Sequence, residues 1–159
     1  MSLALRPARP DDAALILALV RELADYEKLL HEVAATQADL DAALFGPQPR
    51  VFCDIAEWDG APAGFALWYY TFSTFRGRHG IFLEDIFVRP DFRGRGIAKA
   101  LMQALARRCV DEGLGRFEWN VLDWNEPAIR FYRSVGAVPL DAWTMQRVSG
   151  EALENLAAG

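Results

Sequence analysis

The sequence predicts a mixed α/β fold, in which a mostly antiparallel central sheet is flanked by helices on both faces. Apolar residues recur at helical spacing in some segments and form nearly continuous strand-like runs in others. Two of these runs, residues 51–58 and 61–72, are joined by Asp59-Gly60, a pair typical of a tight hairpin turn. No linker, repeat or low-complexity tract divides the 159 residues, so we expect a single domain over residues 1–159.

Two helices are expected between the first strand and this hairpin. Residues 3–6 resemble a short strand, and Pro10-Asp11 starts a helix with Asp11 as its N-cap. Thr36 and Asp39 have the spacing of a capping box, which opens a second helix that ends at Gly46-Pro47. The apolar stripe of the first helix consists of Leu15, Ile16, Leu19, Leu23 and Tyr26.

The second half of the chain alternates strands and helices. A polar loop at residues 73–80 leads into an apolar strand at 81–88, which Pro90 breaks. A helix is expected at 96–112, a strand at 116–122, a helix at 126–135 and a last strand at 143–148. The final ten residues fit a short helix or a frayed end. The apolar stripe of the helix at 96–112 is Ile97, Leu101, Leu105 and Cys109.

Composition excludes several classes of protein. The chain is 52% hydrophobic and 25% charged, and no apolar run approaches the roughly 20 residues that cross a bilayer, so we expect no membrane contact. Its net charge of -5 argues against binding nucleic acid. Cys53 and Cys109 are far apart, and His31 and His79 are isolated, so we expect no metal site. Unpaired cysteines fit a reducing, cytoplasmic compartment.

The segment Arg93-Gly-Arg-Gly-Ile-Ala98 joins the strand at 81–88 to the long helix. Gly94 and Gly96 allow a sharp turn, and a helix N-terminus offers unpaired N–H groups and partial positive charge, which suit a phosphate or pyrophosphate. The segment lacks the spacing of a Walker A loop, and Lys99 stands where the dinucleotide fingerprint has its third glycine.

Glu84 and Asp85 are adjacent carboxylates in an otherwise apolar strand. Alternation predicts that they point to opposite faces of the sheet. A buried acid is costly unless it is paired or used, so either can serve as a general base or form a structural ion pair, for example with Arg6 or Arg116. Further along, Asn125 fits a helix cap, and Tyr132 lies nearly two turns later, where it can face the same ligand or pack as a core residue.

Taken together, these segments resemble the GCN5-related N-acetyltransferase (GNAT) family, whose acetyl-CoA signature matches Arg93-x-x-Gly96-x-Ala98. Leu83-Glu84-Asp85, Asp123-Trp-Asn-Glu126 and Phe131-Tyr132 resemble its diamine acetyltransferase branch, which includes the spermidine/spermine N1- and thialysine N-epsilon-acetyltransferases. Arg6-Pro-Ala8 and Glu22-Leu-Ala-Asp-Tyr26-Glu27 also resemble that branch, so the resemblance covers almost the whole chain.

This resemblance implies the GNAT fold, acetyl-CoA as cosubstrate, a small primary amine as acceptor, direct transfer and a homodimer. Glu84 would accept the amine proton, directly or through water, and Tyr132 would protonate the departing thiolate, while a backbone N–H on the Phe87-Val88 strand polarises the carbonyl. The residues implied to bind acetyl-CoA are Ile86, Phe87, Val88, Arg93, Gly94, Arg95, Gly96, Ile97, Ala98, Lys99, Asn125, Glu126, Pro127 and Ala128. The residues implied to bind substrate are Tyr26, Glu27, Glu84, Asp85, Glu118, Trp119 and Asn120.

The choice of amine depends on the loop at residues 73–80. Ser73 stands where the polyamine-acting members have an acid, and Arg76 and Arg78 make the loop basic. The sequence of this loop resembles the thialysine branch more closely, and it favours a lysine-like amino acid or a short diamine over a long polycation. Two other functions stay open: acetylation of peptides or proteins, and a CoA-binding sensor without catalysis.

Overall fold

The computed structural model describes all residues, Met1–Gly159. It contains two compact units, Met1–Leu122 and Asp123–Gly159, and each is described by itself. The first unit contains one five-stranded sheet in the order β1-β2-β3-β4-β5. The strands are β1 (Leu3–Pro7), β2 (Phe52–Trp58), β3 (Ala61–Ser73), β4 (Arg78–Val88) and β5 (Phe117–Trp119).

The sheet is mixed and mostly antiparallel, as the sequence predicts. Each of the first four strands pairs antiparallel with the next, and only β5 runs parallel to its neighbour β4. The β2–β3 turn has positive φ at both central residues, 50° at Asp59 and 81° at Gly60. A two-residue turn with positive φ at both positions matches the right-handed twist of the strands that it joins, as this hairpin requires.

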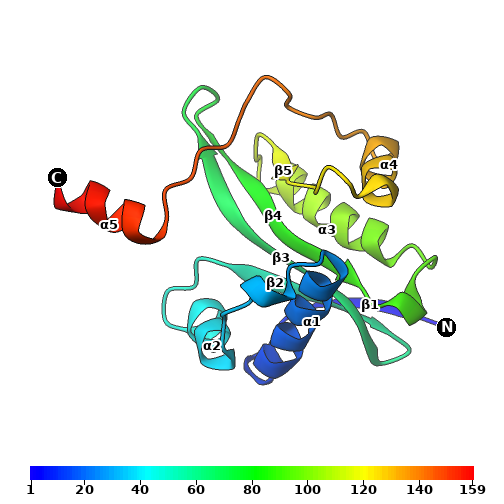
Figure 1. Cartoon of the computed structure of the whole chain (residues 1–159). Helices are drawn as coiled ribbons and strands as arrows, with labels where there is room; N and C mark the ends of the chain where they lie inside the picture. Colours follow the sequence, from blue (N-terminus) through cyan, green and yellow to red (C-terminus); the bar gives the residue numbers. More distant parts are fainter. The chain divides into compact units, whose positions relative to one another are not determined.

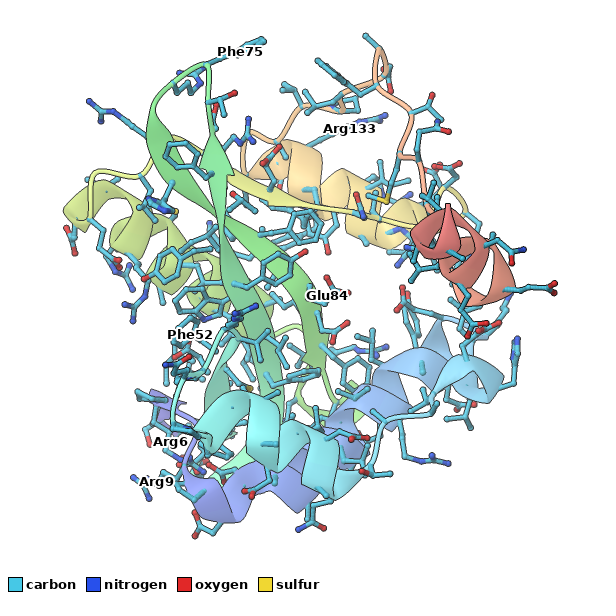
Figure 2. All side chains as sticks on the ribbon, turned by 90° about the vertical axis from the view of Figure 1, so that its left-hand side faces the viewer. Arg6, Arg9, Phe52, Phe75, Glu84 and Arg133 are labelled. Atoms are coloured by element: carbon cyan, nitrogen blue, oxygen red, sulfur yellow. The ribbon has the colours of Figure 1, made fainter.

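The β3–β4 hairpin is longer than expected. The predicted loop at 73–80 shrinks to residues 74–77, because β3 continues to Ser73 and β4 begins at Arg78. Phe72 and His79 face each other across the extension, with ring centroids 5.0 Å apart. Such cross-strand contacts extend the pairing of β3 and β4 through polar residues, and the periodicity of the sequence does not predict this extension. Phe75 lies at the exposed tip (Figure 2).

Helices cover both faces of this sheet (Figure 1). On one face, α1 (Ala13–Tyr26) and α2 (Gln37–Phe45) pack on the strands through Ile16, Leu19 and Leu44. On the other face lies α3 (Ile97–Asp111), and the guanidinium of its Arg108 sits 5.0 Å above the ring of Trp68. The predicted stripe of α3, Ile97, Leu101, Leu105 and Cys109, is buried.

Local capping explains where the first two helices begin. The predicted box at α2 is present: Thr36 Oγ1 accepts from the Asp39 N–H, and Asp39 Oδ2 accepts from the Thr36 N–H. The prediction of Asp11 as the cap of α1 is wrong. A 3-10 turn, η1 (Pro10–Asp12), precedes α1, and Asp12 instead accepts from the Arg9 N–H and from the Arg6 guanidinium.

The second unit contains α4 (Glu126–Ser134) and α5 (Gly150–Ala158). The helix expected at 126–135 is therefore confirmed, and the last residues form a helix. The strand predicted at 143–148 is wrong, because a strand requires a hydrogen-bonded neighbour and no ladder includes these residues. None of the helices in the structure has the length and apolar character needed to span a membrane.

Candidate active site

The glycine-containing loop follows β4 directly. A 3-10 turn, η3 (Pro90–Phe92), leads from β4 into the loop, and α3 begins at Ile97. Gly94 and Gly96 have φ of 75° and 74°, in the left-handed region that favours glycine. The first turn of α3 holds no acidic residue, and its N–H groups have no intrahelical acceptor. Strand, glycine turn and helix N-terminus thus form the predicted anion-binding arrangement.

The two arginines of the loop contact aromatic rings of the protein. Arg93 donates from Nε to the Val88 carbonyl at 3.0 Å, and its guanidinium carbon lies 5.1 Å from the Tyr26 ring centroid. Arg95 lies 4.9 Å from the ring of Trp58 and 5.7 Å from that of Phe92. Both arginine side chains are therefore held against the protein.

Beside this loop, β4 continues beyond the end of β5. The two strands pair only over Ile81–Leu83 and Phe117–Trp119. Within the first unit, the last residues of β4 therefore have an edge that β5 does not cover. Such an edge offers unpaired backbone donors and acceptors.

Hydrogen-bond alternation shows which residues face that edge. The Arg89 N–H donates to the Ala63 carbonyl at 2.8 Å, and hydrogen-bonded pairs alternate along an antiparallel ladder. Phe87 and Asp85 consequently turn their backbone groups toward β3, opposite Phe65 and Leu67. Ile86 and Val88 turn theirs toward the uncovered edge. Of the three strand residues predicted to bind the cofactor, these two can offer a backbone N–H.

A bulge in β4 changes the expected positions of the acids. Asp85 pairs with Leu67 and Leu83 pairs with Trp68, so Glu84 is an extra residue without a partner on β3. Leu67 belongs to the core beneath α1, and Glu84 lies close enough to Tyr69, two residues along from Leu67 on the same face, for its charge to add to burial in raising the pKa of Tyr69. The expectation that the acids occupy opposite faces is therefore wrong. Figure 2 shows Glu84 projecting from β4.

Burial and like charge act on this group of acids. Burial, together with the negative charges of Glu84 and Glu27, raises the pKa of Asp85 to about 7. Burial also raises the pKa of Glu27. It raises the pKa of Tyr69 as well, and the nearby charge of Glu84 adds to that effect. The site therefore concentrates carboxylates on one face, where a cationic amine would be attracted.

The alternative of a structural ion pair with Arg6 or Arg116 is wrong. Arg6 binds Asp12 at 2.6 Å and Glu57 at 2.7 Å. Arg116 binds Glu118 at 2.8 Å. Both arginines are thus occupied elsewhere, and neither neutralises Glu84 or Asp85.

The remaining predicted substrate residues lie at two places in the first unit. Tyr26 ends α1 and is 39% exposed, and Glu27 follows it, half-buried and close enough to influence Asp85. On β5, Glu118 pairs with Phe82 and Trp119 with Leu83, one residue before the bulge. Asn120 is exposed just past β5. The first unit thus brings Tyr26, Glu27, Glu84 and Asp85 together.

The residues predicted at the start of α4 belong to the second unit. Asn125 is buried, and its side chain caps the helix by accepting from the Ala128 N–H at 3.4 Å, with Pro127 in the first turn. Tyr132 lies on α4 beside Phe131, with ring centroids 5.6 Å apart. The predicted cap is confirmed. Sequence reasoning missed Tyr69, because only the bulge brings Glu84 toward it.

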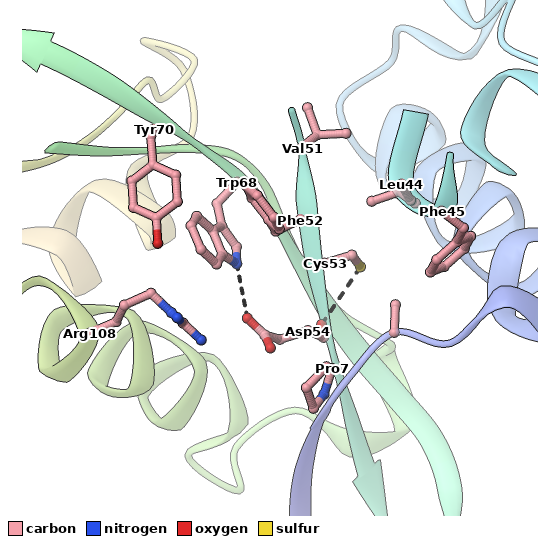
Figure 3. A pocket seen from close by; sticks show the side chains of 11 residues that line it. Pro7, Leu44, Phe45, Val51, Phe52, Cys53, Asp54, Trp68, Tyr70 and Arg108 are labelled. Atoms are coloured by element: carbon pink, nitrogen blue, oxygen red, sulfur yellow. Dashed lines mark hydrogen bonds between the residues drawn. The ribbon is translucent and has the colours of Figure 1, made fainter. Parts of the chain in front are cut away.

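A pocket of about 260 Å³ lies elsewhere in the first unit, between α2, the start of β2 and α3 (Figure 3). Trp68 Nε1 donates to Asp54 at 3.0 Å on one of its walls. None of the predicted site residues lines this pocket. The structure also contains no group of three or more His, Cys, Asp or Glu side chains arranged to hold a metal ion.

Comparison with known proteins gives consistent matches. The model of the acetyltransferase (GNAT) family matches residues 16–137. A thialysine N-epsilon-acetyltransferase from Sus scrofa is 38% identical over 98% of each chain. An L-ornithine N5-acetyltransferase from Arabidopsis thaliana is 30% identical over 94% of this chain and 86% of the other. Among solved structures, an integron cassette protein of V. cholerae has a TM-score of 0.83, at 26% identity over 100% of this chain and 99% of the other.

Proposed function

Because the chain belongs to the acetyltransferase (GNAT) family, we propose that it transfers the acetyl group of acetyl-CoA to the terminal amine of a small, lysine-like amino acid. The observation that carries this proposal is the group of three carboxylates, Glu27, Glu84 and Asp85, beside a strand edge that leads into a glycine loop. We also propose that both units form one catalytic domain, since the family match at 16–137 crosses their boundary after Leu122.

Acetyl-CoA supplies an activated thioester, and the chain supplies donors for its phosphates and its amide-containing arm. The backbone N–H groups of residues 94–99 would hold the pyrophosphate at the start of α3. Arg93 and Arg95 flank that turn. Ile86 and Val88 would bond to the pantetheine and acetyl end along the strand edge, and residues 125–128 would complete the site from the start of α4.

The amine must lose a proton before it attacks, because an alkyl ammonium has a pKa near 10. We assign proton acceptance to Glu84, because it is exposed, whereas the neighbouring Asp85 is half-buried. The remaining carboxylates would orient the ammonium group before that transfer. The predicted polarising N–H on the Phe87-Val88 strand is best supplied by Ile86 or Val88, because Phe87 turns toward β3. Tyr132 would donate a proton to the departing thiolate.

The names of the relatives favour an amino-acid substrate. Thialysine and ornithine are both α-amino acids whose side chain ends in a primary amine. The β3–β4 tip carries Arg76 and Arg78, which would repel a long polycation but tolerate an amino acid in which one carboxylate offsets one of the two ammonium groups. We therefore rank thialysine, ornithine and lysine above spermidine and spermine.

We further propose a homodimer in the cytoplasm. No ladder of the sheet supplies a strand partner for residues 143–148, and Trp143 is 78% exposed. A second copy of the chain could supply that partner. Two free, buried cysteines suit a reducing compartment.

A thiol-release assay with acetyl-CoA tests the function directly. Thialysine, ornithine, lysine, putrescine, spermidine, spermine and a peptide with a free N-terminus would be compared at equal concentration. We expect kcat/KM to be highest for one of the three amino acids. Preference for the peptide would contradict the proposal, and binding of acetyl-CoA without turnover of any amine would favour a sensor.

A further inference from the structure

Two arginines that follow β4, Arg89 and Arg93, contact one face of α1. Arg89 donates from Nε and Nη2 to the two carboxylate oxygens of Glu22, at 3.0 and 2.8 Å. Four residues later, the guanidinium carbon of Arg93 lies 5.1 Å from the ring centroid of Tyr26. Glu22 and Tyr26 are also four residues apart, so they lie one turn apart on the same face of α1. We call these four residues the α1 clamp.

The Arg93 half of the clamp is fixed from several directions. Its Nε donates to the Val88 carbonyl at 3.0 Å, which ties the side chain to the end of β4. Its guanidinium also lies 5.5 Å from the ring centroid of Phe87. A planar guanidinium can stack flat on a ring while its Nε–H makes a directed bond, whereas a lysine ammonium is not planar and cannot make both contacts in this geometry.

The clamp joins two regions that the proposed function uses together. Arg93 is the first residue of the glycine loop, and Tyr26 is the last residue of α1, directly before Glu27. The charge of Glu27 acts on Asp85, so the position of this helix end affects the acidic group on β4. A contact that moves Tyr26 would therefore move an acid of the substrate site.

We propose that the side chain of Arg93 is a positioning residue for the amine site, which holds Tyr26 and Glu27 against β4, rather than a ligand of the CoA phosphates. This inference rests on the proposed function. It predicts that Arg93 affects amine recognition more than acetyl-CoA binding, although Arg93 belongs to the acetyl-CoA signature. The loop would then bind acetyl-CoA through its backbone N–H groups, while the side chain of Arg93 would position Tyr26 and Glu27 in the amine site.

Three variants test the inference: R93M, R93K, and R107Q as a matched control on the exposed surface of α3. The dissociation constant of acetyl-CoA is measured by calorimetry, and KM and kcat are measured for the preferred amine. We expect R93M and R93K each to raise the amine KM about tenfold and to change acetyl-CoA binding less than threefold. If Arg93 instead binds phosphate, R93K should resemble the wild type, because lysine also binds phosphate, and R93M alone should weaken acetyl-CoA binding tenfold or more.

Hydrogen–deuterium exchange supplies a readout that does not require activity. In both Arg93 variants, amides of residues 23–30 should exchange faster than in the wild type, whereas R107Q should leave them unchanged. Unchanged exchange in both Arg93 variants would overturn the inference. If the wild type acetylates none of the tested amines, the proposed function fails, but exchange and calorimetry still test the clamp. Circular dichroism checks that each variant folds, and R93K covers the case in which R93M does not.

Discussion

Glu84 and Asp85 are neighbours in the chain, yet both carboxylates lie on the face of the sheet that carries α1. The bulge at Glu84 interrupts the alternation that would otherwise separate them. Their proximity has an electrostatic consequence, because the charge of Glu84 adds to burial in raising the pKa of Asp85 to about 7. Glu84 is thus exposed, whereas Asp85 is half-buried and has a pKa near neutrality, so the two acids can take different roles in catalysis.

The first prediction separates the roles of the two acids. Glu84→Gln should lower kcat/KM by about 100-fold or more, since general-base catalysis contributes roughly 10²–10⁴ in rate. Asp85→Asn should lower it by about tenfold at most, because it removes a charge near the amine but leaves the proposed acceptor. Both are measured with the preferred amine at saturating acetyl-CoA.

Glu118→Gln is the matched control, because Glu118 lies on β5 and is paired with Arg116. It should lower kcat/KM less than Glu84→Gln does, and only through KM, with kcat unchanged. Full activity of Glu84→Gln together with inactive Asp85→Asn would assign proton acceptance to Asp85 instead.

The second prediction concerns the pH dependence of stability. The pKa of Asp85 in the folded protein, about 7, is above its ordinary value of 3.8. Between these two pH values the folded state binds more protons than the unfolded state, so the free energy of unfolding falls as pH rises. Asp85→Asn removes this titration. The free energy of unfolding of the variant, minus that of the wild type, should therefore be more positive at pH 8 than at pH 4 by a few kcal/mol.

Urea unfolding at both pH values measures this difference. Asp41→Asn, at an exposed position of α2, is the control and should show a much smaller change between pH 4 and pH 8. If the free energies of unfolding of Asp85→Asn and the wild type differ by the same amount at both pH values, then Asp85 does not titrate in this range.

The third prediction concerns Tyr132. Tyr132→Phe removes the hydroxyl that is the proposed proton donor and keeps the ring, so kcat should fall about 100-fold while the dissociation constant of acetyl-CoA stays within threefold. Tyr70→Phe is a matched control, because it also removes one hydroxyl, which donates to Glu112 at 2.6 Å. Release of the CoA thiol, followed by stopped flow, should slow only in Tyr132→Phe. Equal slowing in both would indicate a general loss of stability rather than a role in protonation.

Several features of the fold follow directly from local sequence. Asp59-Gly60 specifies its own turn, and Thr36 with Asp39 specifies a helix start, because each depends on residues within three positions. The glycine loop is equally local, since Gly94 and Gly96 can adopt the positive φ of its turn without the strain that a side chain would add. The family, and the order of strands and helices up to α4, could therefore be predicted from the sequence.

Features that depend on partners distant in sequence could not be predicted in this way. The bulge at Glu84 appears only when β4 is aligned with β3, and the contact of Arg93 with Tyr26 joins segments 67 positions apart. The segment 143–148 has a strand-like pattern, but pairing decides whether a strand forms. Asp12 replaces Asp11 as the acid at the start of α1 because Arg6 of β1 binds it, which is again a contact between elements.

The last prediction concerns the glycine at the start of α3. Gly96 has φ of 74° and open space around the position of a Cβ, so a substitution strains the backbone without causing a clash. Asparagine visits this conformation more readily than β-branched residues. Gly96→Asn should therefore weaken acetyl-CoA binding only a few-fold, whereas Gly96→Val should weaken it tenfold or more by displacing the loop N–H groups.

Gly113 provides the matched control for this prediction. It has φ of 67° and equally open space, but it follows the other end of α3. Gly113→Val should cost a similar amount of stability, about 1–2 kcal/mol for a strained left-handed residue, and leave the dissociation constant of acetyl-CoA unchanged. Calorimetry and thermal melting separate the two effects. If both valine variants weakened acetyl-CoA binding equally, the loss would follow from stability, and the backbone of the glycine loop would not be the phosphate site.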